Sequence, residues 1–315
     1  MAKQDYSRVN TINKDGKVKP ARAPFGYYGA KLRLARRIVE MLPPHNAWVE
    51  AFCGSAALTL AKPPAPIEVI NDKDDQIVNL FEQLRDNTEA LCEAIALTPY
   101  AKAEMEKARS GKPIDDPLEK ARRFLVATMM TVNGTGGSAH SGFSFSQSYT
   151  RQDIEARVCR WKNLPERLEN VVERLRNVRI ENRDARELVE MFVDRPATLM
   201  YLDPPYFVKR EHSYVIDAND RDFHTELLSI CRRSRCMLLI SAYESELYNE
   251  MLTPERGWEK IYIETKTRDT SGKDYAKTEV LWTNKHFIRA QSTGRVPIRL
   301  TKQERANQKV NPPRR

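Results

Sequence analysis

Short apolar segments alternate with segments of helical periodicity along most of this chain, and this alternation limits its fold more than any other feature. Segments of strand length are predicted at 47–53, 67–70, 178–181, 198–202, 237–241, 260–264 and 279–283. Helical spacing occurs between them at 30–42, 55–61, 74–97, 185–193, 222–233 and 244–252. Strands that alternate with helices in this way predict an α/β fold with a mostly parallel sheet.

The middle of the chain has a different character and predicts a helical insert near 86–165. Helices are expected at 99–109, 117–131 and 151–175, the last with a break at Pro165. A loop rich in glycine and small polar residues covers 133–149, and so long a loop inside a folded domain usually has a function. We therefore divide the chain into a flexible basic arm (1–22), a catalytic domain (23–85 and 166–287), the insert (86–165) and a basic tail (288–315).

Composition excludes several classes of protein. The chain has 315 residues, 41% of them hydrophobic and 30% charged, and no apolar run approaches the ~18 residues of a membrane span. The first 22 residues lack the apolar core of a secretory signal. The five cysteines form no C-x-x-C pair and the five histidines are scattered, so neither a disulfide framework nor a metal site is expected. These features favour a cytoplasmic protein.

The net charge of +9 is concentrated at the two ends of the chain. Residues 1–22 carry six Lys or Arg and two acids, and residues 288–315 carry eight and one, so the segment between them is close to neutral. Basic tails release counterions when they meet phosphates, which favours a nucleic-acid partner. A solvated terminus that only aids solubility explains the charge equally well.

The tetrapeptide Asp203-Pro204-Pro205-Tyr206 follows the apolar run 198–202 directly. Ligands of open α/β sheets bind beyond the carboxyl ends of the strands, so these residues lie where chemistry is expected. Asp203 supplies an anionic acceptor, the proline pair stiffens the turn and fixes the direction of the Pro204 carbonyl, and Tyr206 supplies a ring for stacking. Such a group suits the amino group of a nucleobase. The alternative is a rigid turn in which Asp203 serves as a cap.

A second group of residues is typical of a nucleoside cofactor site. Gly54 follows the strand at 47–53 and allows close approach of a ligand to the backbone. Asp72 ends the next strand, where an acid binds ribose hydroxyls in dinucleotide folds, although Asn71 or Asp72 could instead cap the following helix. Asp184 is a further candidate acid at the same edge, with capping of the helix at 185–193 as its stronger interpretation. The segment 24–31 (PFGYYGAK) could cradle a carboxylate or phosphate before the first helix, although taken alone it is better explained as a loop that leads into a surface helix.

Taken in order, these elements resemble the Dam-like family of adenine-specific DNA methyltransferases over about 24–287. The resemblance implies a seven-stranded Rossmann-like sheet that binds S-adenosylmethionine, with a target-recognition domain inserted before the Asp-Pro-Pro-Tyr element. It also implies that Asp203, Pro204 and Tyr206 hold the target adenine. The residues that it places around the cofactor are Tyr27, Lys31, Glu50, Phe52, Gly54 and Asp72. The family often has a second glycine where this chain has Ala56, and the segment 279–284 (EVLWTN) is similar to its closing strand.

The loop at 133–149 is similar in placement to the DNA-contacting hairpin of that family. Its polar side chains are candidates for contacts with base edges, and they are Asn133, Ser138, His140, Ser144, Ser146, Gln147 and Arg151. A plain linker is the alternative. The recognition sequence, a companion restriction nuclease and a homodimeric state are not determined by these residues.

The expected reaction moves a methyl group from S-adenosylmethionine to the exocyclic amino nitrogen of adenine in double-stranded DNA, without a metal ion. The base must leave the duplex for this, and Tyr206 is expected to stack on it. Methylation of adenine in RNA, and a non-catalytic nucleic-acid-binding protein that keeps a relic of the fold, are the alternatives.

Overall fold

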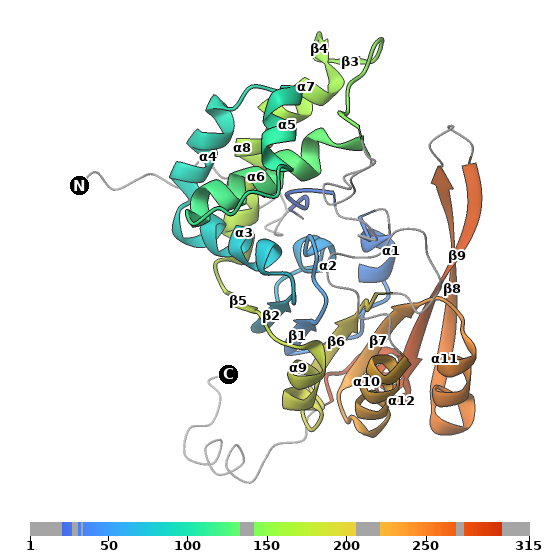
Figure 1. Cartoon of the computed structure of the whole chain (residues 1–315). Coiled ribbons are helices and arrows are strands. Elements are labelled where there is room, and N and C mark those ends of the chain that lie inside the picture. Colours follow the sequence, from blue (N-terminus) through green and yellow to red (C-terminus); the bar gives the residue numbers. More distant parts are fainter. Residues whose placement is uncertain are drawn as a thin grey trace, which may run out of the picture.

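The computed structural model describes residues 21–26, 31–32, 34–132, 142–205, 221–268 and 274–297, and a sheet of seven strands is at the centre of this part of the chain (Figure 1). The strands in chain order are β1 (Ala47–Glu50), β2 (Ile67–Asn71), β5 (Val178–Glu181), β6 (Thr198–Leu202), β7 (Met237–Ala242), β8 (Trp258–Arg268) and β9 (Asp274–Asn284). Their order across the sheet is β5-β2-β1-β6-β7-β9-β8. The first five of this order are parallel, and β9 is antiparallel to both β7 and β8. The mostly parallel seven-stranded sheet expected from the sequence is confirmed.

Helices cover both faces of this sheet. They are α1 (Ala35–Val39), α2 (Ala57–Ala61), α9 (Ala185–Phe192), α10 (Arg221–Arg233), α11 (Glu246–Met251) and α12 (Lys285–Thr293), with a 3-10 turn at Pro254–Arg256. Successive strand residues point to opposite faces. Trp48 and Leu199 accordingly pack with α1, α2 and α12, whereas Val49 and Met200 pack with α9, α10 and α11. Burial on both faces explains why the central strands β6 and β7 are almost continuously apolar.

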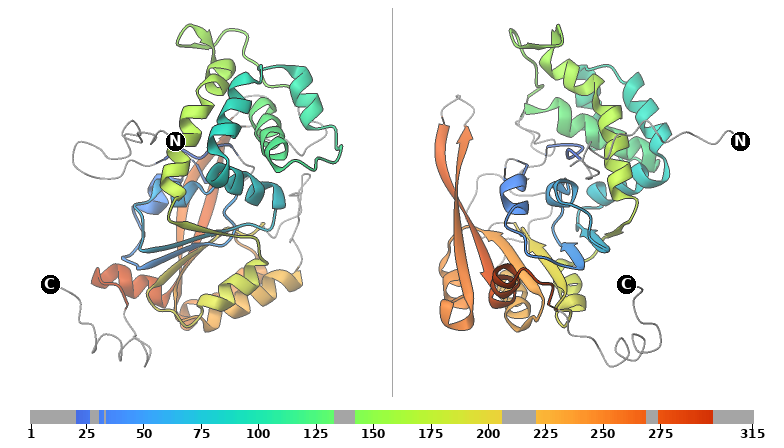
Figure 2. Two further views of the ribbon diagram at one scale, coloured as in Figure 1. Left: turned by 90° about the vertical axis from the view of Figure 1, so that its left-hand side faces the viewer. Right: turned by 180° about the vertical axis from the view of Figure 1, so that it is seen from behind.

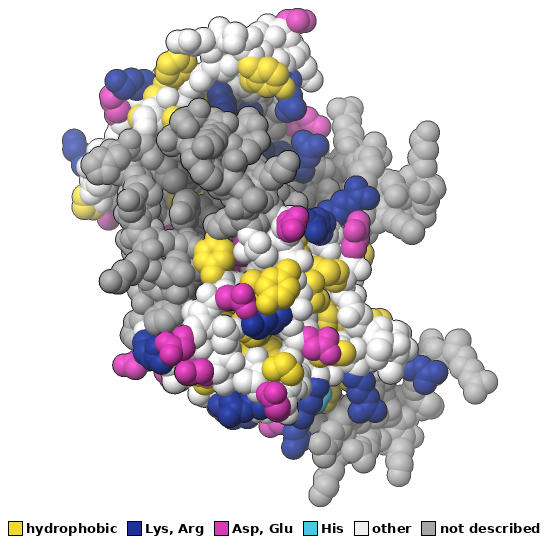
Figure 3. Space-filling view, turned by 90° about the vertical axis from the view of Figure 1, so that its right-hand side faces the viewer, with side chains coloured by type: hydrophobic (Ala, Val, Ile, Leu, Met, Phe, Trp, Pro, Cys, Tyr) yellow, Lys and Arg dark blue, Asp and Glu magenta, His cyan; other side chains and the backbone are white. Residues whose placement is uncertain are grey.

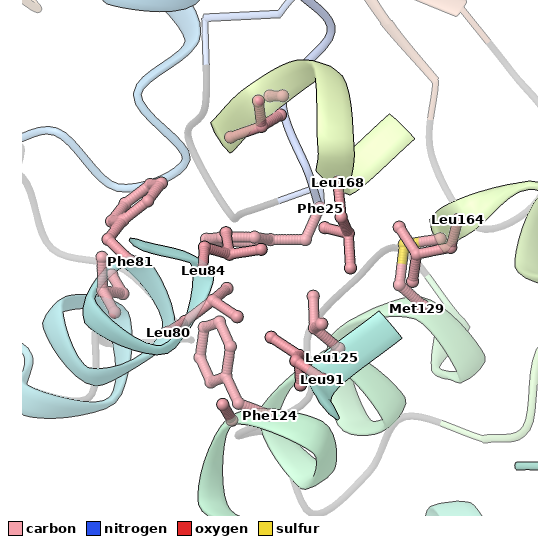
Figure 4. Packing of buried hydrophobic residues seen from close by; sticks show 14 of the residues in the cluster. Phe25, Leu80, Phe81, Leu84, Leu91, Phe124, Leu125, Met129, Leu164 and Leu168 are labelled. Atoms are coloured by element: carbon pink, nitrogen blue, oxygen red, sulfur yellow. The ribbon is translucent and has the colours of Figure 1, made fainter. Parts of the chain in front are cut away.

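The remaining helices form a body that stands at one end of the sheet (Figure 2). They are α3 (Asp75–Asp86), α4 (Thr88–Leu97), α5 (Lys102–Ala108), α6 (Pro117–Met130), α7 (Ala156–Lys162) and α8 (Leu164–Leu175). Apolar side chains from α3, α4, α6 and α8 meet in its core, with Phe25 among them (Figure 4). Phe25 contacts Phe124 edge-on at 5.0 Å between ring centroids, and the Arg167 guanidinium donates to the Pro24 carbonyl at 2.8 Å. The segment before α1 is thus anchored in the helical body.

Two helices differ from those expected. The segment predicted as one helix at 74–97 is two helices, because Asn87 has a non-helical φ of −135°. The segment predicted as a helix from 151 begins instead with a hairpin of β3 (Thr150–Arg151) and β4 (Ile154–Glu155). Gln152 and Asp153 both have positive φ in its two-residue turn, a geometry that suits the twist of hairpins and that Asn-Gly usually signals. The sequence Gln-Asp lacks that signal.

Pro165 lies in the first turn of α8, where its missing N–H leaves no helical bond unmade, and the break falls two residues earlier at Asn163. The insert boundary placed at residue 165 therefore falls inside α8. Both α3 and α8 also share the core of the helical body, so the body extends beyond the predicted insert on both sides. Arg174 of α8 binds Glu68 of β2 through two nitrogens, at 2.5 and 2.9 Å, which ties this body to the sheet.

The first residues of the predicted basic tail, 288–293, belong to a helix that was not predicted. Helix α12 starts at Lys285, with the Asn284 side chain accepting from the Phe287 N–H at 3.0 Å. Phe287 and Ala290 are buried against the sheet. Only two apolar positions are buried in this nine-residue helix, so its periodicity is weak in sequence. Residues 298–315 lie outside the described part.

Strand β8 forms one edge of the sheet and carries charged side chains. Lys260 pairs with Glu244 at 2.5 Å, and the Tyr262 hydroxyl donates to the same carboxylate at 3.1 Å. Figure 3 shows acidic and basic side chains interspersed with apolar ones on this side of the molecule. Charges on an edge strand oppose pairing with a second sheet. Within the described residues, no helix has the length and apolar character needed to cross a membrane.

Candidate active site

Asp203 follows β6 at the carboxyl edge of the sheet and is bound by Lys31. The Lys31 ammonium lies 2.8 Å from both Asp203 oxygens, and 3.3 Å from Oε1 of Glu279 on β9. The Lys31 and Glu279 side chains are 6% and 7% exposed and that of Asp203 is 16% exposed. Lys31 precedes α1, and its carbonyl accepts the N–H groups of Leu34 and Ala35. Residues from three distant parts of the chain thus form one charged cluster.

Glu279 was not singled out in the sequence. Its carboxylate also accepts a hydrogen bond of 3.0 Å from the hydroxyl of Ser241 on β7. Buried acids need such partners because an isolated carboxylate loses its hydration without compensation. The available signal in the sequence was that Glu279, a charged residue, begins the predicted strand 279–283 (EVLWT), whose other residues are mostly apolar. Its partners could not be inferred, because Lys31 lies 248 positions away.

Glu50, at the end of β1, is buried and caps helix α2. Its Oε2 accepts the Thr59 N–H at 2.9 Å and a short bond from the Thr59 hydroxyl, which in turn accepts from Trp48 Nε1 at 2.7 Å. The residue at the N-cap itself, Ala56, has no side-chain oxygen, so Glu50 accepts the otherwise unpaired Thr59 amide of the first helical turn in its place. Burial raises the pKa of Glu50 to about 7, against the opposing effect of the Thr59 hydrogen bonds.

Gly54 and Asp72 form one structural unit. Gly54 has a φ of +48°, a conformation that glycine adopts without strain, and its N–H donates to Asp72 Oδ2 at 2.8 Å. The other Asp72 oxygen accepts the Asp74 N–H at 3.0 Å. The N-cap of α3 is Asp74, which accepts from Gln76 at 2.9 Å, so capping by Asn71 or Asp72 is wrong. Burial raises the pKa of Asp72 to about 6.

Ala56 also has a left-handed backbone, with a φ of +53°. It occupies the position where the resembling family often has a second glycine. A side chain in this conformation costs roughly 1–2 kcal/mol, which a glycine would avoid. Its buried N–H donates to the Cys53 carbonyl at 2.7 Å, and this bond helps to hold the turn.

Asp184 caps α9, as its stronger interpretation predicted. It accepts from the Arg186 N–H at 2.9 Å and from the Arg186 guanidinium at 2.7 and 2.9 Å. These bonds hold the pKa of Asp184 at about 2. Phe52 is half-buried, with its ring 6.4 Å from and nearly perpendicular to that of Phe223.

The candidate DNA-contacting residues differ in exposure. Ser144 is buried and its N–H donates to Met130 at 2.8 Å, so a contact of its side chain with a base edge is not supported. Gln147 and Arg151 are exposed, and Ser146 is half-buried with its hydroxyl accepting the Tyr149 N–H at 3.0 Å. The predicted residues outside the described part of the chain are Tyr27, Asn133, Ser138, His140 and Tyr206. Pro204 is buried and Pro205 half-buried after β6.

The sequence of this chain is similar to a known protein family and to a curated relative. The profile of the family described as D12 class N6 adenine-specific DNA methyltransferase matches residues 27–269. The type II methyltransferase M1.LlaDCHI of Lactococcus lactis subsp. cremoris is 28% identical over 197 residues, which are 59% of this chain. The match spans 66% of that relative, slightly less than two thirds.

Two solved structures are distantly similar. A putative methyltransferase, yhhF, from Escherichia coli has 12% identity and a TM-score of 0.30, covering 81% of this chain and 82% of that chain. An SAM-dependent methyltransferase from Agrobacterium tumefaciens has 11% identity and a TM-score of 0.34, covering 81% and 60%. The fold assignment rests on the strand order and directions given above.

Proposed function

Since the chain belongs to the D12 class N6 adenine-specific DNA methyltransferase family, we propose that it methylates the exocyclic amino group of adenine in double-stranded DNA. The family match covers the segment that carries Lys31, Gly54, Asp72 and Asp203. Strand β1 pairs with β2 on one side and β6 on the other, so Gly54, Asp72 and Asp203 follow neighbouring strands at one edge of the sheet. This shared edge is the observation that carries the proposal.

The residues at this edge fit S-adenosylmethionine as the cofactor. Each Asp72 oxygen accepts one backbone N–H and keeps further lone-pair capacity, which suits a donor such as a ribose hydroxyl. The Ser55 hydroxyl, next to the Gly54 turn, is buried with no hydrogen-bond partner among the described residues. Of the predicted residues, we assign Asp72, Gly54 and Phe52 to the cofactor. Glu50 and Asp184 act on it only through the helices that they cap.

The chain's own part in the reaction is to hold and polarise the target base. When bound, S-adenosylmethionine supplies a methyl group on a positively charged sulfonium. The adenine amino nitrogen is a weak nucleophile because its lone pair is delocalised into the ring. Acceptance of its hydrogens by the Asp203 carboxylate and the Pro204 carbonyl localises that pair and stabilises the positive charge that develops on nitrogen. Positioning and electrostatics thus suffice without a covalent intermediate.

DNA recognition is assigned to the insert and the termini. The target base has to be flipped out of the duplex, with Tyr206 as the stacking partner. Ser146, Gln147 and Arg151 are the described residues that we assign to base edges, near the exposed rings of Phe145 and Tyr149. The basic ends of the chain add affinity for phosphates that does not depend on sequence.

The proposal is tested by incubating the protein with labelled S-adenosylmethionine and unmethylated duplex DNA, single-stranded DNA or RNA. We expect label in the duplex, recovered as N6-methyladenine after digestion and mass spectrometry. Label in RNA alone would show that RNA, and not DNA, is the substrate. Label in none of the three nucleic acids, with protein that binds the cofactor, would contradict the proposal.

A further inference from the structure

Lys31 contacts two carboxylates, those of Asp203 and Glu279. Only Asp203 belongs to the Asp-Pro-Pro-Tyr element that we assign to the target adenine. The Lys31 ammonium is 2.8 Å from each Asp203 oxygen and 3.3 Å from Glu279. The three side chains carry one positive and two negative charges, so the cluster has a net charge of −1 when all are ionised. Ser241 fixes the second carboxylate by a 3.0 Å hydrogen bond.

The second contact of Lys31 matters because Asp203 also has to accept a hydrogen bond from the adenine amino group. The Asp203 carboxylate has lone pairs for both the Lys31 ammonium and the adenine amino group, but these two positively polarised donors repel each other, so the approach of adenine weakens the contact between Lys31 and Asp203. Lys31 is 6% exposed, and an ammonium left without a partner at such a site is costly. Glu279 is already within ion-pair distance and keeps the ammonium paired as the contact with Asp203 loosens.

We propose that Glu279 is a positioning residue for methyl transfer, which holds Lys31 beside Asp203 and keeps the cluster negative when adenine binds. The inference rests on the proposed function. It places Lys31 in the base pocket rather than in the cofactor site to which the resemblance assigned it. The positive charge that develops on the amino nitrogen is stabilised more by a cluster of charge −1 than by a neutral pair of Lys31 and Asp203.

The pH dependence of the reaction reports on this arrangement. Among the described residues, the further titratable groups that interact electrostatically with Asp203 include Glu50 of β1, Tyr201 of β6 and Tyr248 of α11. Burial raises the pKa of both tyrosine hydroxyls far above neutrality, so they stay neutral in the acid range. Removal of the Lys31 charge makes protonation of Asp203 easier, and removal of the Glu279 charge makes it harder.

The test compares Glu279→Gln and Lys31→Met with the wild-type protein under single-turnover conditions, with saturating tritium-labelled S-adenosylmethionine and unmethylated plasmid DNA, from about pH 5 to 8. For Glu279→Gln we expect a methyl-transfer rate about tenfold lower at the upper end of this range. The acid limb of its pH–rate profile, where the rate falls as Asp203 is protonated, should move down by about one pH unit. For Lys31→Met we expect a lower rate and an acid limb moved up by about one unit. Cofactor affinity, measured by calorimetry, should stay within about twofold for both variants.

Two further variants separate positioning from stability. Glu279→Asp keeps the charge one methylene further away, and it should recover part of the rate that Glu279→Gln loses. Glu68→Gln removes another buried acid, paired with Lys62 and Arg174 but remote from Asp203 in sequence and in hydrogen bonding. It should lower the melting temperature and leave the acid limb unchanged. If Glu279→Gln does not fold, Ser241→Ala, which removes the hydrogen bond to Glu279, should still lower the rate.

The outcomes distinguish this inference from the function on which it rests. A Glu279→Gln protein with the wild-type rate and acid limb would overturn the positioning role, as would acid limbs that move in the same direction in the two main variants. A large loss of cofactor affinity in Lys31→Met would return Lys31 to the cofactor site and overturn the assignment. Failure of the proposed function would instead appear as the absence of N6-methyladenine with the wild-type protein.

Discussion

The Gly54 amide donates a hydrogen bond of 2.8 Å to the Asp72 carboxylate, so the turn after β1 and the acid after β2 form one unit. The spacing of 18 residues between them therefore has a structural origin. The carboxylate stabilises the left-handed turn at Gly54, and Asp72 lies at the same edge of the sheet as Asp203.

Asp72→Asn should weaken S-adenosylmethionine binding at neutral pH and remove much of its pH dependence. The pKa of Asp72 in the free protein is about 6, so the ionised acceptor is lost as the pH falls through 6. Wild-type affinity should accordingly fall between about pH 7 and pH 5, and the variant's affinity should change much less. Calorimetry at several pH values checks this. Equal affinities for the two proteins at neutral pH would leave Asp72 with a purely structural role.

Glu50→Gln should change how stability depends on pH. The folded-state pKa of Glu50, about 7, is above its ordinary value of 4.5, so its contribution to stability is fully present below pH 4.5 and is lost as the pH rises through 7. Between about pH 5 and pH 8 the wild-type protein should therefore lose about 2–4 kcal/mol relative to Glu50→Gln, whose amide does not ionise. Urea unfolding of both proteins across this range measures the difference. Parallel profiles would show that Glu50 ionises normally.

The strands were the best-predicted part of the fold. The predicted bounds of β5 and β6 agree with the structure. For β6 the reason is that a buried parallel strand gives a short apolar run bounded by polar residues. The helical body was predicted less well. The break at Asn87 and the hairpin at Gln152-Asp153 depend on backbone conformations for which these residues are not the usual signal.

The candidate site was only partly predictable for a related reason. Asp203 and Asp72 follow strands and could be placed at the sheet edge from sequence. The Lys31–Glu279 contact joins residues 248 positions apart, and it depends on the antiparallel pairing of β9 with β7, which local patterns do not contain. Glu50 looked like a cofactor residue, and only the packing of α2 against β1 shows that its oxygen caps that helix.

A triple substitution of Ser146, Gln147 and Arg151 by Ala should change the choice of methylated sites more than cofactor affinity. Base-edge hydrogen bonds contribute about 1–3 kcal/mol of discrimination per well-made pair. Ser144→Ala is the matched control, because that side chain is buried and should not alter the choice of sites. Sequencing that detects N6-methyladenine after reaction with plasmid DNA gives the site preference. An unchanged preference in the triple variant would argue for a plain linker.

Deletion of residues 298–315 should lower the salt dependence of DNA binding and leave the fold intact. The segment carries six basic residues and one acid and lies beyond α12, whose Phe287 and Ala290 are part of the core. For every phosphate that the shortened chain no longer neutralises, the slope of log K against log salt should fall by about 0.9. Binding isotherms at several salt concentrations check this. A slope equal to that of the full chain would show that the tail only aids solubility.

The central claim is that the Asp203 carboxylate activates the adenine amino group, and Asp203→Ala tests it most directly. Lys31 would keep Glu279 as a partner in this variant, and Asp203 lies after β6 rather than in its core, so the fold should persist. We therefore expect methyl transfer to fall by about 10²–10³, the loss typical of one preorganised electrostatic contact. Melting temperature and N6-methyladenine formation should be measured on the same sample. A melting temperature near that of the wild type with this loss of rate is the predicted result, and a folded variant with full activity would contradict the account.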